Sequence, residues 1–366
     1  MYLALYRKFR PKVFEDVIGQ NHIVSALTNQ VKSGQIGHAY LFTGSRGTGK
    51  TTCAKIFARA INCKFATSGS PCGKCENCLA LEEASNVDIF EIDAASNNGV
   101  NEIRELREKV KYPPINGKYK VYIIDEVHML TDSAFNALLK TLEEPPKHVV
   151  FILATTEVYK IPATILSRCM RFDFRLVSNE LLVNHVKFVF DSLNISYDNQ
   201  SVEAIALAGE GSVRDTLSVA DCVVSFCGNN ITYEKTIEVL GISDKKAVLE
   251  LAQSIVNKNL GKVLEDINKI YESGKNLIAL GKELTICFKN LVVIKNCNNA
   301  KQLLGVTEDE WQKLNEIATS ISTESLIVFM QKFSEIEPEL KYALSPRTLI
   351  ELTSLECASY DSQKKN

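Results

Sequence analysis

The segment GSRGTGKT at residues 44–51 constrains the fold of this chain more than any other feature. It fits the spacing G-x-x-x-x-G-K followed by Ser or Thr, and it lies between the apolar run AYLF at 39–42 and the helical pattern TTCAKIFARAI. Glycines let backbone N–H groups wrap around a phosphate, and the start of the following helix adds a favourable dipole. The segment therefore predicts a nucleotide-binding loop in an α/β domain.

Each residue type in this loop has a chemical reason to be there. Lys50 reaches the β- and γ-phosphate oxygens, and the hydroxyl of Thr51 ligates Mg²⁺. The predicted nucleotide-binding residues of the loop are Gly44, Ser45, Arg46, Gly47, Thr48, Gly49, Lys50 and Thr51.

The second half of an ATPase site is predicted about 75 residues further along. The run VYIIDE ends in Asp125, which can support Mg²⁺, and Glu126, which can orient or deprotonate the attacking water. An apolar strand ending in an acidic turn is common by itself, but its place after a phosphate-binding loop favours the metal site. His128 is then interpreted as a structural or switch residue, because Glu126 already fills the role of the base.

Other polar residues remain ambiguous from sequence physics alone. The strand ending in Thr155 and Thr156 could place a hydroxyl near the γ-phosphate, but Thr is also simply a good strand residue. Arg168 and Arg214 lie in short turns, and a surface arginine is usually a solvated charge. Phosphoryl transfer nevertheless needs cationic stabilisation, which makes both arginines candidates.

Four of the eleven cysteines cluster at Cys63, Cys72, Cys75 and Cys78. Four thiolates with two C-x-x-C steps can close a tetrahedron around Zn²⁺, and a closed site has a structural role. The insert between the ligands is too polar to fold by itself, which is a physical reason for a metal. Iron–sulfur ligation or a redox C-x-x-C is the alternative. The scattered remaining cysteines are expected to be buried thiols.

The N-terminal half is predicted to be a parallel sheet covered by helices on both faces. Near-continuous apolar runs separated by helix-length connections are typical of such sheets. The expected strands are 39–42, 87–92, 120–125, 149–155 and 170–174.

Residues 163–337 contain no proline, and their periodicity predicts helices packed on helices. The longer ones are expected at 245–258, 260–273, 276–297, 307–317, 323–336 and 346–358. The polar tail 361–366 is expected to be a disordered end or the start of a linker.

Hydropathy excludes membrane-spanning and secreted proteins, and the charge is unevenly distributed along the chain. The net charge is −2, yet residues 1–64 carry +8, so one end of the chain is electropositive. No apolar run approaches the length of a membrane-spanning helix, and the first residues lack the apolar core of a secretory signal. We therefore expect a cytoplasmic protein without membrane contacts.

Seven segments in a fixed order resemble the gamma/tau family of bacterial DNA polymerase III, which are clamp-loader ATPases of the AAA+ class. They are the phosphate-binding loop, the four-cysteine insert, DEVHML at 125–130, NALLKTLEEPP at 136–146, LATTE at 153–157, ILSRC at 165–169 and GSVRD at 211–215. The opening YRKFRPKVFEDVIGQ at 6–20 also resembles that family.

The resemblance implies roles for individual residues. Asp125 and Glu126 become the Walker B carboxylates, Thr155 the sensor 1 residue and Arg214 the sensor 2 residue. Arg168 becomes an arginine finger that acts on ATP held by the neighbouring subunit. The four clustered cysteines match the family's zinc ligands. The backbone around Val17, Ile18 and Gly19 would face adenine.

The resemblance also implies three domains: an AAA+ core with a RecA-like sheet at 1–178 and the zinc module at about 62–80, a helical lid at 179–242, and a helical collar at 243–366. It implies ATP, Mg²⁺ and Zn²⁺ as ligands. The implied partners are the delta and delta-prime subunits, other gamma/tau copies, the beta sliding clamp and primed DNA.

DNA would be held through its phosphates, with Asn97–Asn101 and Arg104 or Arg107 as candidates. Tau forms continue well beyond the collar, so a chain ending at Asn366 is expected to load clamps without coupling to helicase and polymerase. No carboxylate set for nucleotidyl transfer is found in the sequence. The alternatives are an ATP-binding scaffold that does not hydrolyse and another ring ATPase, such as a branch-migration helicase.

Overall fold

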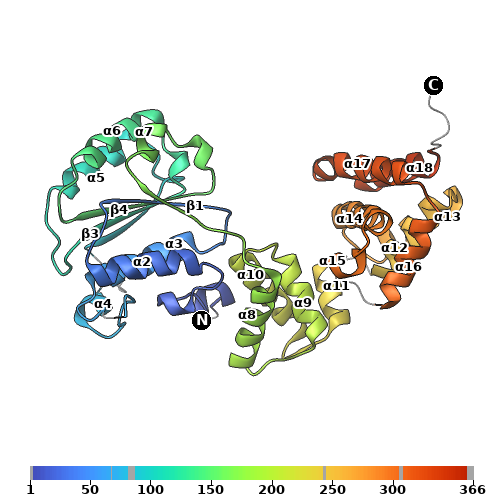
Figure 1. Cartoon of the computed structure of the whole chain (residues 1–366), viewed down its shortest axis with the longest axis horizontal. Coiled ribbons are helices and arrows are strands. Elements are labelled where there is room, and N and C mark those ends of the chain that lie inside the picture. Colours follow the sequence, from blue (N-terminus) through green and yellow to red (C-terminus); the bar gives the residue numbers. More distant parts are fainter. Residues whose placement is uncertain (1–2, 67, 81–86, 242–244, 305–307, 361–366) are drawn as a thin grey trace. The chain divides into compact units, whose positions relative to one another are not determined.

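The chain forms two compact units, residues 1–232 and 233–366. In this computed structural model the described residues are 3–66, 68–80, 87–241, 245–304 and 308–360 (Figure 1). The polar tail expected at 361–366 lies outside them.

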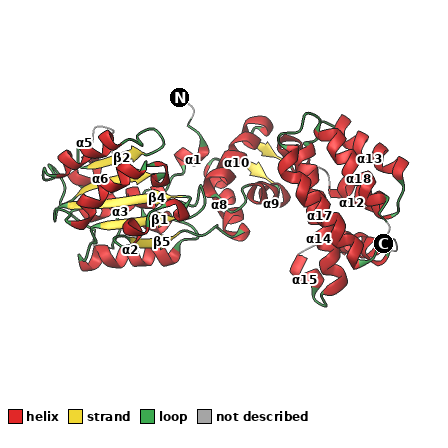
Figure 2. Ribbon diagram, turned by 90° about the horizontal axis from the view of Figure 1, so that it is seen from above, coloured by secondary structure: helices red, strands yellow, loops and turns green. Residues whose placement is uncertain are grey.

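A parallel sheet in the order β2-β3-β4-β1-β5 forms the centre of the first unit. The strands are β1 Ala39–Thr43, β2 Ile89–Asp93, β3 Lys120–Asp125, β4 Val149–Thr155 and β5 Met170–Asp173. Each falls where the sequence predicts a strand, to within two residues at either end. The prediction of a parallel sheet is confirmed, and Figure 2 shows its strands side by side.

Alternate residues of these strands supply two separate cores. Leu41, Ile124 and Leu153 point to one face, and Phe42 and Ile123 point to the other. The first face is covered by α5, α6 and α7, and the second by α2 and α3 (Figure 1). The bounds are α2 Asn21–Ser33, α3 Lys50–Asn62, α5 Val100–Val110, α6 Asp132–Glu143 and α7 Ala163–Leu166. Burial on both faces explains why the strands are apolar without alternation.

The start of α6 shows how the sequence sets a helix boundary. The Thr131 hydroxyl accepts a hydrogen bond from the Ala134 N–H, so it caps the helix. Shorter elements of the same unit connect the larger ones. They are α1 Leu5–Lys8, α4 Glu76–Ala80 and the 3₁₀ turns η1 Phe14–Asp16, η2 Val127–Met129 and η3 Val158–Lys160.

Three helices and a small parallel ladder complete the first unit. The helices are α8 Asn179–Ser192, α9 Asn199–Ala208 and α10 Val213–Cys227, and the ladder pairs β6 Ser196–Tyr197 with β7 Asn230–Ile231. The Ser212 hydroxyl caps α10 by accepting from the Asp215 N–H. The ladder is a finding that the sequence did not predict, because two-residue strands leave no periodic pattern.

The second unit is helical, as predicted, around a core that includes Leu284, Phe288 and Phe333. Its helices are α11 Tyr233–Leu240, α12 Lys245–Val256, α13 Leu260–Glu272, α14 Leu277–Asn296, α15 Ala300–Leu304, α16 Glu308–Thr319, α17 Thr323–Leu340 and α18 Pro346–Ala358. The structure differs from the expectation at α17, which continues past 336 and contains Pro338. A proline there removes one hydrogen bond from the last turn, while Ile336 and Leu340 still pack into the core.

None of the helices in the described part of the chain combines the length and apolar character needed to cross a membrane.

Candidate functional site

The predicted phosphate-binding loop connects β1 to α3 at the carboxyl edge of the sheet. Parallel pairing places Thr43 of β1 opposite Thr155 of β4, so β4 ends beside the loop. Ligands of open parallel sheets bind at this edge. Sequence reasoning placed the loop here, and the structure confirms its position between strand and helix.

Two glycines of the loop have no room for a side chain. Gly44 has φ +137°, and a Cβ there would lie 2.3 Å from the carbonyl oxygen of Phe174. Gly47 has φ +74°, and a Cβ there would lie 1.9 Å from the Ser212 hydroxyl, which caps α10. The loop is therefore pressed against both the end of the sheet and the start of α10.

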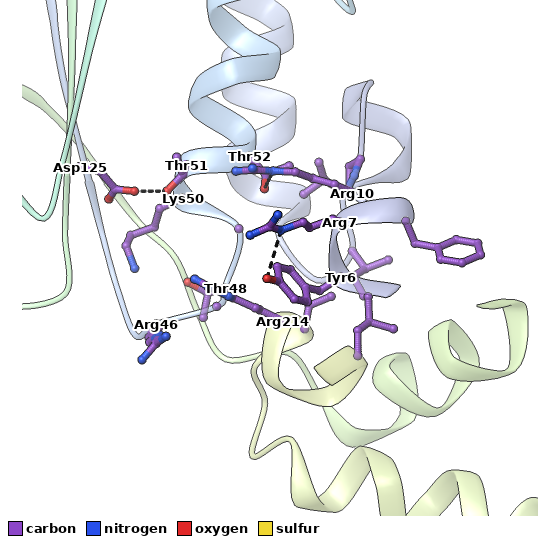
Figure 3. A pocket seen from close by; sticks show the side chains of 18 of the residues that line it. Tyr6, Arg7, Arg10, Arg46, Thr48, Lys50, Thr51, Thr52, Asp125 and Arg214 are labelled. Carbon is purple, nitrogen blue, oxygen red and sulfur yellow. Dashed lines mark hydrogen bonds between the residues drawn. The ribbon is translucent and has the colours of Figure 1, made fainter. Parts of the chain in front are cut away.

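Lys50, Thr51 and Asp125 come together as the sequence predicts (Figure 3). The Thr51 hydroxyl donates to Asp125 Oδ2 at 2.6 Å. Lys50 Nζ donates to the carbonyl oxygens of Gly44 and Ser45, each at 2.8 Å. Burial lowers the pKa of Lys50, and the carboxylates of Glu126 and Asp125 oppose that shift. A hydroxyl and a carboxylate in contact are two oxygen ligands of the type that Mg²⁺ takes.

Glu126 follows Asp125 in an unusual backbone conformation. Its φ is +47°, in the left-handed region that non-glycine residues seldom adopt. Its Oε2 accepts a hydrogen bond from the Thr156 hydroxyl at 3.1 Å and lies 3.4 Å from His128 Nδ1. The carboxylate is thus held by groups on β4's end and on η2, and it lines the same cavity as Lys50.

His128 joins three polar residues beside the site. Its side chain is 7% exposed, its Nδ1 lies 3.0 Å from the Thr155 hydroxyl, and its Nε2 lies 3.0 Å from Glu157 Oε2. The Thr155 hydroxyl also accepts from the Glu157 N–H at 3.0 Å. Of the two threonines, Thr156 contacts Glu126 directly, while Thr155 is connected to it through His128. The strand pattern made both threonines candidates, and nothing in the sequence distinguishes the one that contacts Glu126 from the one that contacts His128.

A cavity of about 670 Å³ opens at this edge, within the first unit (Figure 3). The predicted residues that line it are Val17, Ile18, Arg46, Gly47, Thr48, Gly49, Lys50, Thr51, Asp125, Glu126 and Arg214. Gly44, Ser45, Gly19 and Thr155 are not in its lining. Gly19 has φ +72° and packs against Val177, which shapes the turn beside Val17 and Ile18.

The two candidate arginines occupy different places. The backbone N–H of Arg214 lies 3.5 Å from the Gly47 carbonyl oxygen, and its side chain lines the cavity. Arg168 does not line it. Its guanidinium donates to Glu143 Oε1 and to the Thr164 carbonyl oxygen, each at 2.7 Å, with one third of the side chain exposed. Intrachain contacts therefore bring Arg214, and not Arg168, to the phosphate-binding loop.

Several residues of the site were missed by sequence reasoning. Tyr6, Arg7 and Arg10 line the cavity. Gln20 is fully buried, and its side chain donates to the Arg175 carbonyl oxygen at 2.7 Å and the Thr48 carbonyl oxygen at 3.4 Å. These contacts tie the loop to the chain leaving β5. Such residues carry no motif, because tertiary contacts alone bring them to the site.

The four clustered cysteines converge on one point. All four Sγ atoms lie within 4.8 Å of one another. The Sγ atoms of Cys63 and Cys75 are 3.9 Å apart, as are those of Cys72 and Cys78. A tetrahedral Zn²⁺ with bonds of about 2.3 Å would set its sulfurs about 3.8 Å apart, so the donor set and its spacing fit that ion.

Backbone amides surround these sulfurs. The N–H of Cys72 donates to Cys63 Sγ at 3.3 Å, and the N–H of Cys78 donates to Cys75 Sγ at 3.4 Å. Burial opposes ionisation of Cys75, but the amide hydrogen bonds outweigh it and lower its pKa to about 6. Backbone hydrogen bonds also lower the pKa of Cys72, whereas burial raises the pKa of Cys63 and of Cys78. The surroundings therefore favour the thiolate, the form that binds metals, at two of the four cysteines.

The insert is fastened to the core on both sides. The Asn77 side chain donates to the Asn62 carbonyl oxygen at 2.9 Å, and the Ser70 hydroxyl donates to Glu15 Oε2 at 2.6 Å. The candidate DNA-contacting residues lie elsewhere, at the start of α5, where Asn97, Asn98 and Arg104 are exposed.

Three family models together match most of the chain. One described as DNA polymerase III, delta subunit, matches residues 19–178, and one described as the clamp loader ATPase lid domain matches 182–229. A third, for domain III of the gamma and tau subunits, matches 231–365. DNA polymerase III subunit gamma of Buchnera aphidicola subsp. Baizongia pistaciae is 36% identical, over 97% of this chain and 96% of that protein. The chain belongs to the gamma/tau family of DNA polymerase III subunits.

Other relatives of this gamma/tau protein are longer. DNA polymerase III subunit tau of Bacillus subtilis is 41% identical over 99% of this chain, which spans 64% of that protein. The tau subunit of Escherichia coli is 37% identical, and the chain spans 56% of it. A solved RuvB variant from Thermotoga maritima is 19% identical, with a TM-score of 0.50 over 85% of this chain and 90% of that one. That likeness concerns the AAA+ fold alone. The family resemblance found in the sequence is confirmed.

Proposed function

We propose that this gamma/tau protein is an ATP-hydrolysing motor subunit of a clamp loader, which opens a sliding clamp and places it on primed DNA. The observation that carries the proposal is the contact between Thr51 and Asp125, with Lys50 and Glu126 lining the same cavity. A cavity of about 670 Å³ at the carboxyl edge of a parallel sheet is of the size that small ligands occupy. The protein would act in the cytoplasm, with the DNA that it serves.

The residues present fit ATP with Mg²⁺. Thr51 and Asp125 would hold Mg²⁺, which neutralises phosphate charge when bound. Lys50 would bind the β- and γ-phosphate oxygens, and the backbone of Gly44–Gly49 would donate to them. The backbone of Val17, Ile18 and Gly19 would face the adenine; the lining of the cavity by Val17 and Ile18 supports this assignment.

Hydrolysis would proceed at Glu126. Its carboxylate would orient the attacking water and take its proton, and the Thr156 hydroxyl holds the Oε2 atom in place. Thr155 would act as sensor 1 through His128, and Arg214 as sensor 2. Arg168 would act at the ATP of the neighbouring subunit; its position outside the lining of the cavity of its own chain supports this assignment.

The rival functions are less consistent with the chain. A scaffold that only binds ATP would not need Lys50, Asp125, Glu126 and Arg168 together. A different ring ATPase would not need the cysteine insert, and the family membership also favours a clamp loader. The three-domain division at 1–178, 179–242 and 243–366 remains part of the proposal, as do DNA contacts by Asn97–Asn101 with Arg104 or Arg107.

The test of this function is reconstitution. We expect ATP hydrolysis by the chain to rise when delta, delta-prime, the beta clamp and primed DNA are added together, because assembly supplies Arg168 and DNA orders the sites. Steady-state phosphate release measures this, and omission of the clamp or the DNA is the control. A rate equal to that of the isolated chain would reject the clamp-loader assignment.

The cysteine cluster gives a separate prediction. We expect one Zn²⁺ per wild-type chain and close to none in Cys75→Ser, because three thiolates no longer close the tetrahedron. When the free metal concentration is a thousand times the dissociation constant, binding adds about 4 kcal/mol to the free energy of unfolding. Loss of the metal in Cys75→Ser should lower the free energy of unfolding by roughly that amount. Elemental analysis and denaturant unfolding measure the two effects.

Cys222→Ser is the matched control for this prediction. The expectation that the scattered cysteines are buried is wrong for Cys222 and Cys297, which are exposed, and Cys222 lies on α10, far along the chain from the cluster. This variant should keep its Zn²⁺ and its stability. Iron with acid-labile sulfide in the wild-type chain would instead support an iron–sulfur cluster, and absence of any metal would remove the structural role.

A further inference from the structure

The N-terminal segment links two parts of the first unit across the nucleotide cavity. At one end, the Leu5 N–H donates to Asp221 Oδ2 of α10 at 3.4 Å, and Leu5 is buried. At the other end, Arg10 Nε donates to the Thr52 hydroxyl in the first turn of α3 at 3.1 Å. The residues between these two anchors therefore lie where the phosphate-binding loop meets α10.

Tyr6 lies between two guanidinium groups at this place (Figure 3). Its hydroxyl accepts a hydrogen bond from Arg7 Nε at 3.2 Å. On the other side, the Arg214 Cζ atom lies 5.2 Å from the centre of the Tyr6 ring. This distance is within the range in which the face of an aromatic ring attracts a cation.

Arg214 has little else to fix the direction of its side chain. Within the described residues, no carboxylate forms an ion pair with its guanidinium. Its backbone N–H lies 3.5 Å from the Gly47 carbonyl oxygen, and its guanidinium also interacts with the Tyr6 hydroxyl. A long side chain without an ion-pair partner samples many rotamers, so Tyr6, mainly through its ring, is the contact that holds it toward the cavity.

We propose that Tyr6 is a positioning residue, which orients Arg214 for the phosphates of a nucleoside triphosphate. The inference rests on the proposed function, since it takes Arg214 to be a nucleotide contact. The ring attracts the guanidinium without neutralising its charge, whereas a carboxylate in its place would form an ion pair and compete with phosphate. Arg7 in turn fixes the ring through the hydroxyl. Tyr6 thus acts through Arg214 and makes no bond to the reacting atoms.

A double-mutant cycle tests this assignment in the full chain. The measured quantity is the dissociation constant of a fluorescent ATP analogue with Mg²⁺, for wild type, Tyr6→Leu, Arg214→Ala and the double variant. We expect Tyr6→Leu to weaken binding about two- to thirtyfold, the range of a cation–π contact. In the Arg214→Ala background the same change should have no further effect. Tyr6→Phe, which keeps the ring, should stay within about twofold of wild type.

Three other results would overturn the inference. Equal weakening by Tyr6→Leu in both backgrounds would mean that Tyr6 contacts the nucleotide itself or supports the fold. Unchanged binding by Arg214→Ala would remove the nucleotide contact on which the inference depends. Weakening by Tyr6→Phe as large as that by Tyr6→Leu would assign the effect to the hydroxyl, which interacts with Arg7 and Arg214, and not to the ring.

Two controls keep the outcomes separate. Tyr112→Leu changes an exposed tyrosine in the loop after α5 and should leave binding unchanged. Thermal unfolding of Tyr6→Leu detects any general loss of structure. If the wild-type chain failed to bind the analogue, the proposed function would fail; if it bound but the cycle showed no coupling, only the role of Tyr6 would fail.

Discussion

Glu126→Gln is expected to bind ATP with near-wild-type affinity and to lose at least about a hundredfold in turnover. Glutamine keeps the shape of the side chain, and its carbonyl oxygen can still accept the hydrogen bond from Thr156. The contacts of Lys50, Thr51 and Asp125 are untouched, so the binding site stays intact. What is lost is the negative charge that polarises water and receives its proton.

The measurements are equilibrium binding of an ATP analogue and single-turnover phosphate release. Glu91→Gln is a suitable control, because it removes a carboxylate of the same unit that pairs with Lys55 at the surface and should change neither quantity by much. Hydrolysis by Glu126→Gln at the wild-type rate would show that another group activates the water. Loss of binding would assign Glu126 to nucleotide or metal affinity.

Arg168→Ala is expected to lower the rate of ATP hydrolysis by the assembled complex roughly a thousandfold, which is the effect of losing an arginine finger. The structure makes a sharper test possible, because Lys50 and Arg168 lie in different parts of the fold. A Lys50→Ala chain has a disabled site of its own but carries an intact Arg168. An Arg168→Ala chain has the reverse defect. Each alone should be inactive, yet complexes assembled from both should regain hydrolysis.

Hydrolysis recovers at an interface where the Arg168 of a Lys50→Ala chain lies at the ATP that a neighbouring Arg168→Ala chain holds. No recovery in the mixture would mean that Arg168 acts within its own chain, or only supports α7 through its bond to Glu143. Arg171→Ala is the matched control, since Arg171 is also a partly exposed arginine paired with a carboxylate, Asp173. It should hydrolyse ATP normally.

The sequence predicted the central sheet well because each buried parallel strand is a nearly continuous apolar run. It missed the ladder of β6 and β7, where two residues per strand carry no pattern. It also ended α17 too early, because Pro338 indicates a break, whereas burial of Leu340 keeps the last turn helical. In both cases contacts with the rest of the fold, and not the local sequence pattern, determine the secondary structure.

The candidate site likewise contains residues that sequence motifs reveal and residues that only tertiary contacts bring to the cavity. Gly44–Thr51, Asp125 and Glu126 are adjacent in sequence to the elements that position them, so motifs reveal them. Tyr6 and Gln20 reach the cavity only because the N-terminal segment folds over it. Arg168 had no place within one chain, and its contacts in the structure give it none near the loop. Its proposed role at the ATP of a neighbouring subunit therefore stays a prediction for the mixing experiment.

The approach of Gly47 to Ser212 bears on how this chain can vary over evolutionary time. In the spacing that defines the loop, position 47 is one of the four places where any residue is formally allowed. In this fold it is as restricted as the defining glycines, because φ is +74° and the hydroxyl of Ser212 fills the space of a side chain. An alanine at 47 would thus meet two separate costs, the strained backbone and the displacement of the Ser212 hydroxyl from its cap on α10. A change at 212, which is 165 residues further along the chain, would relieve only the second cost, so glycine at 47 stays favoured whichever residue caps α10.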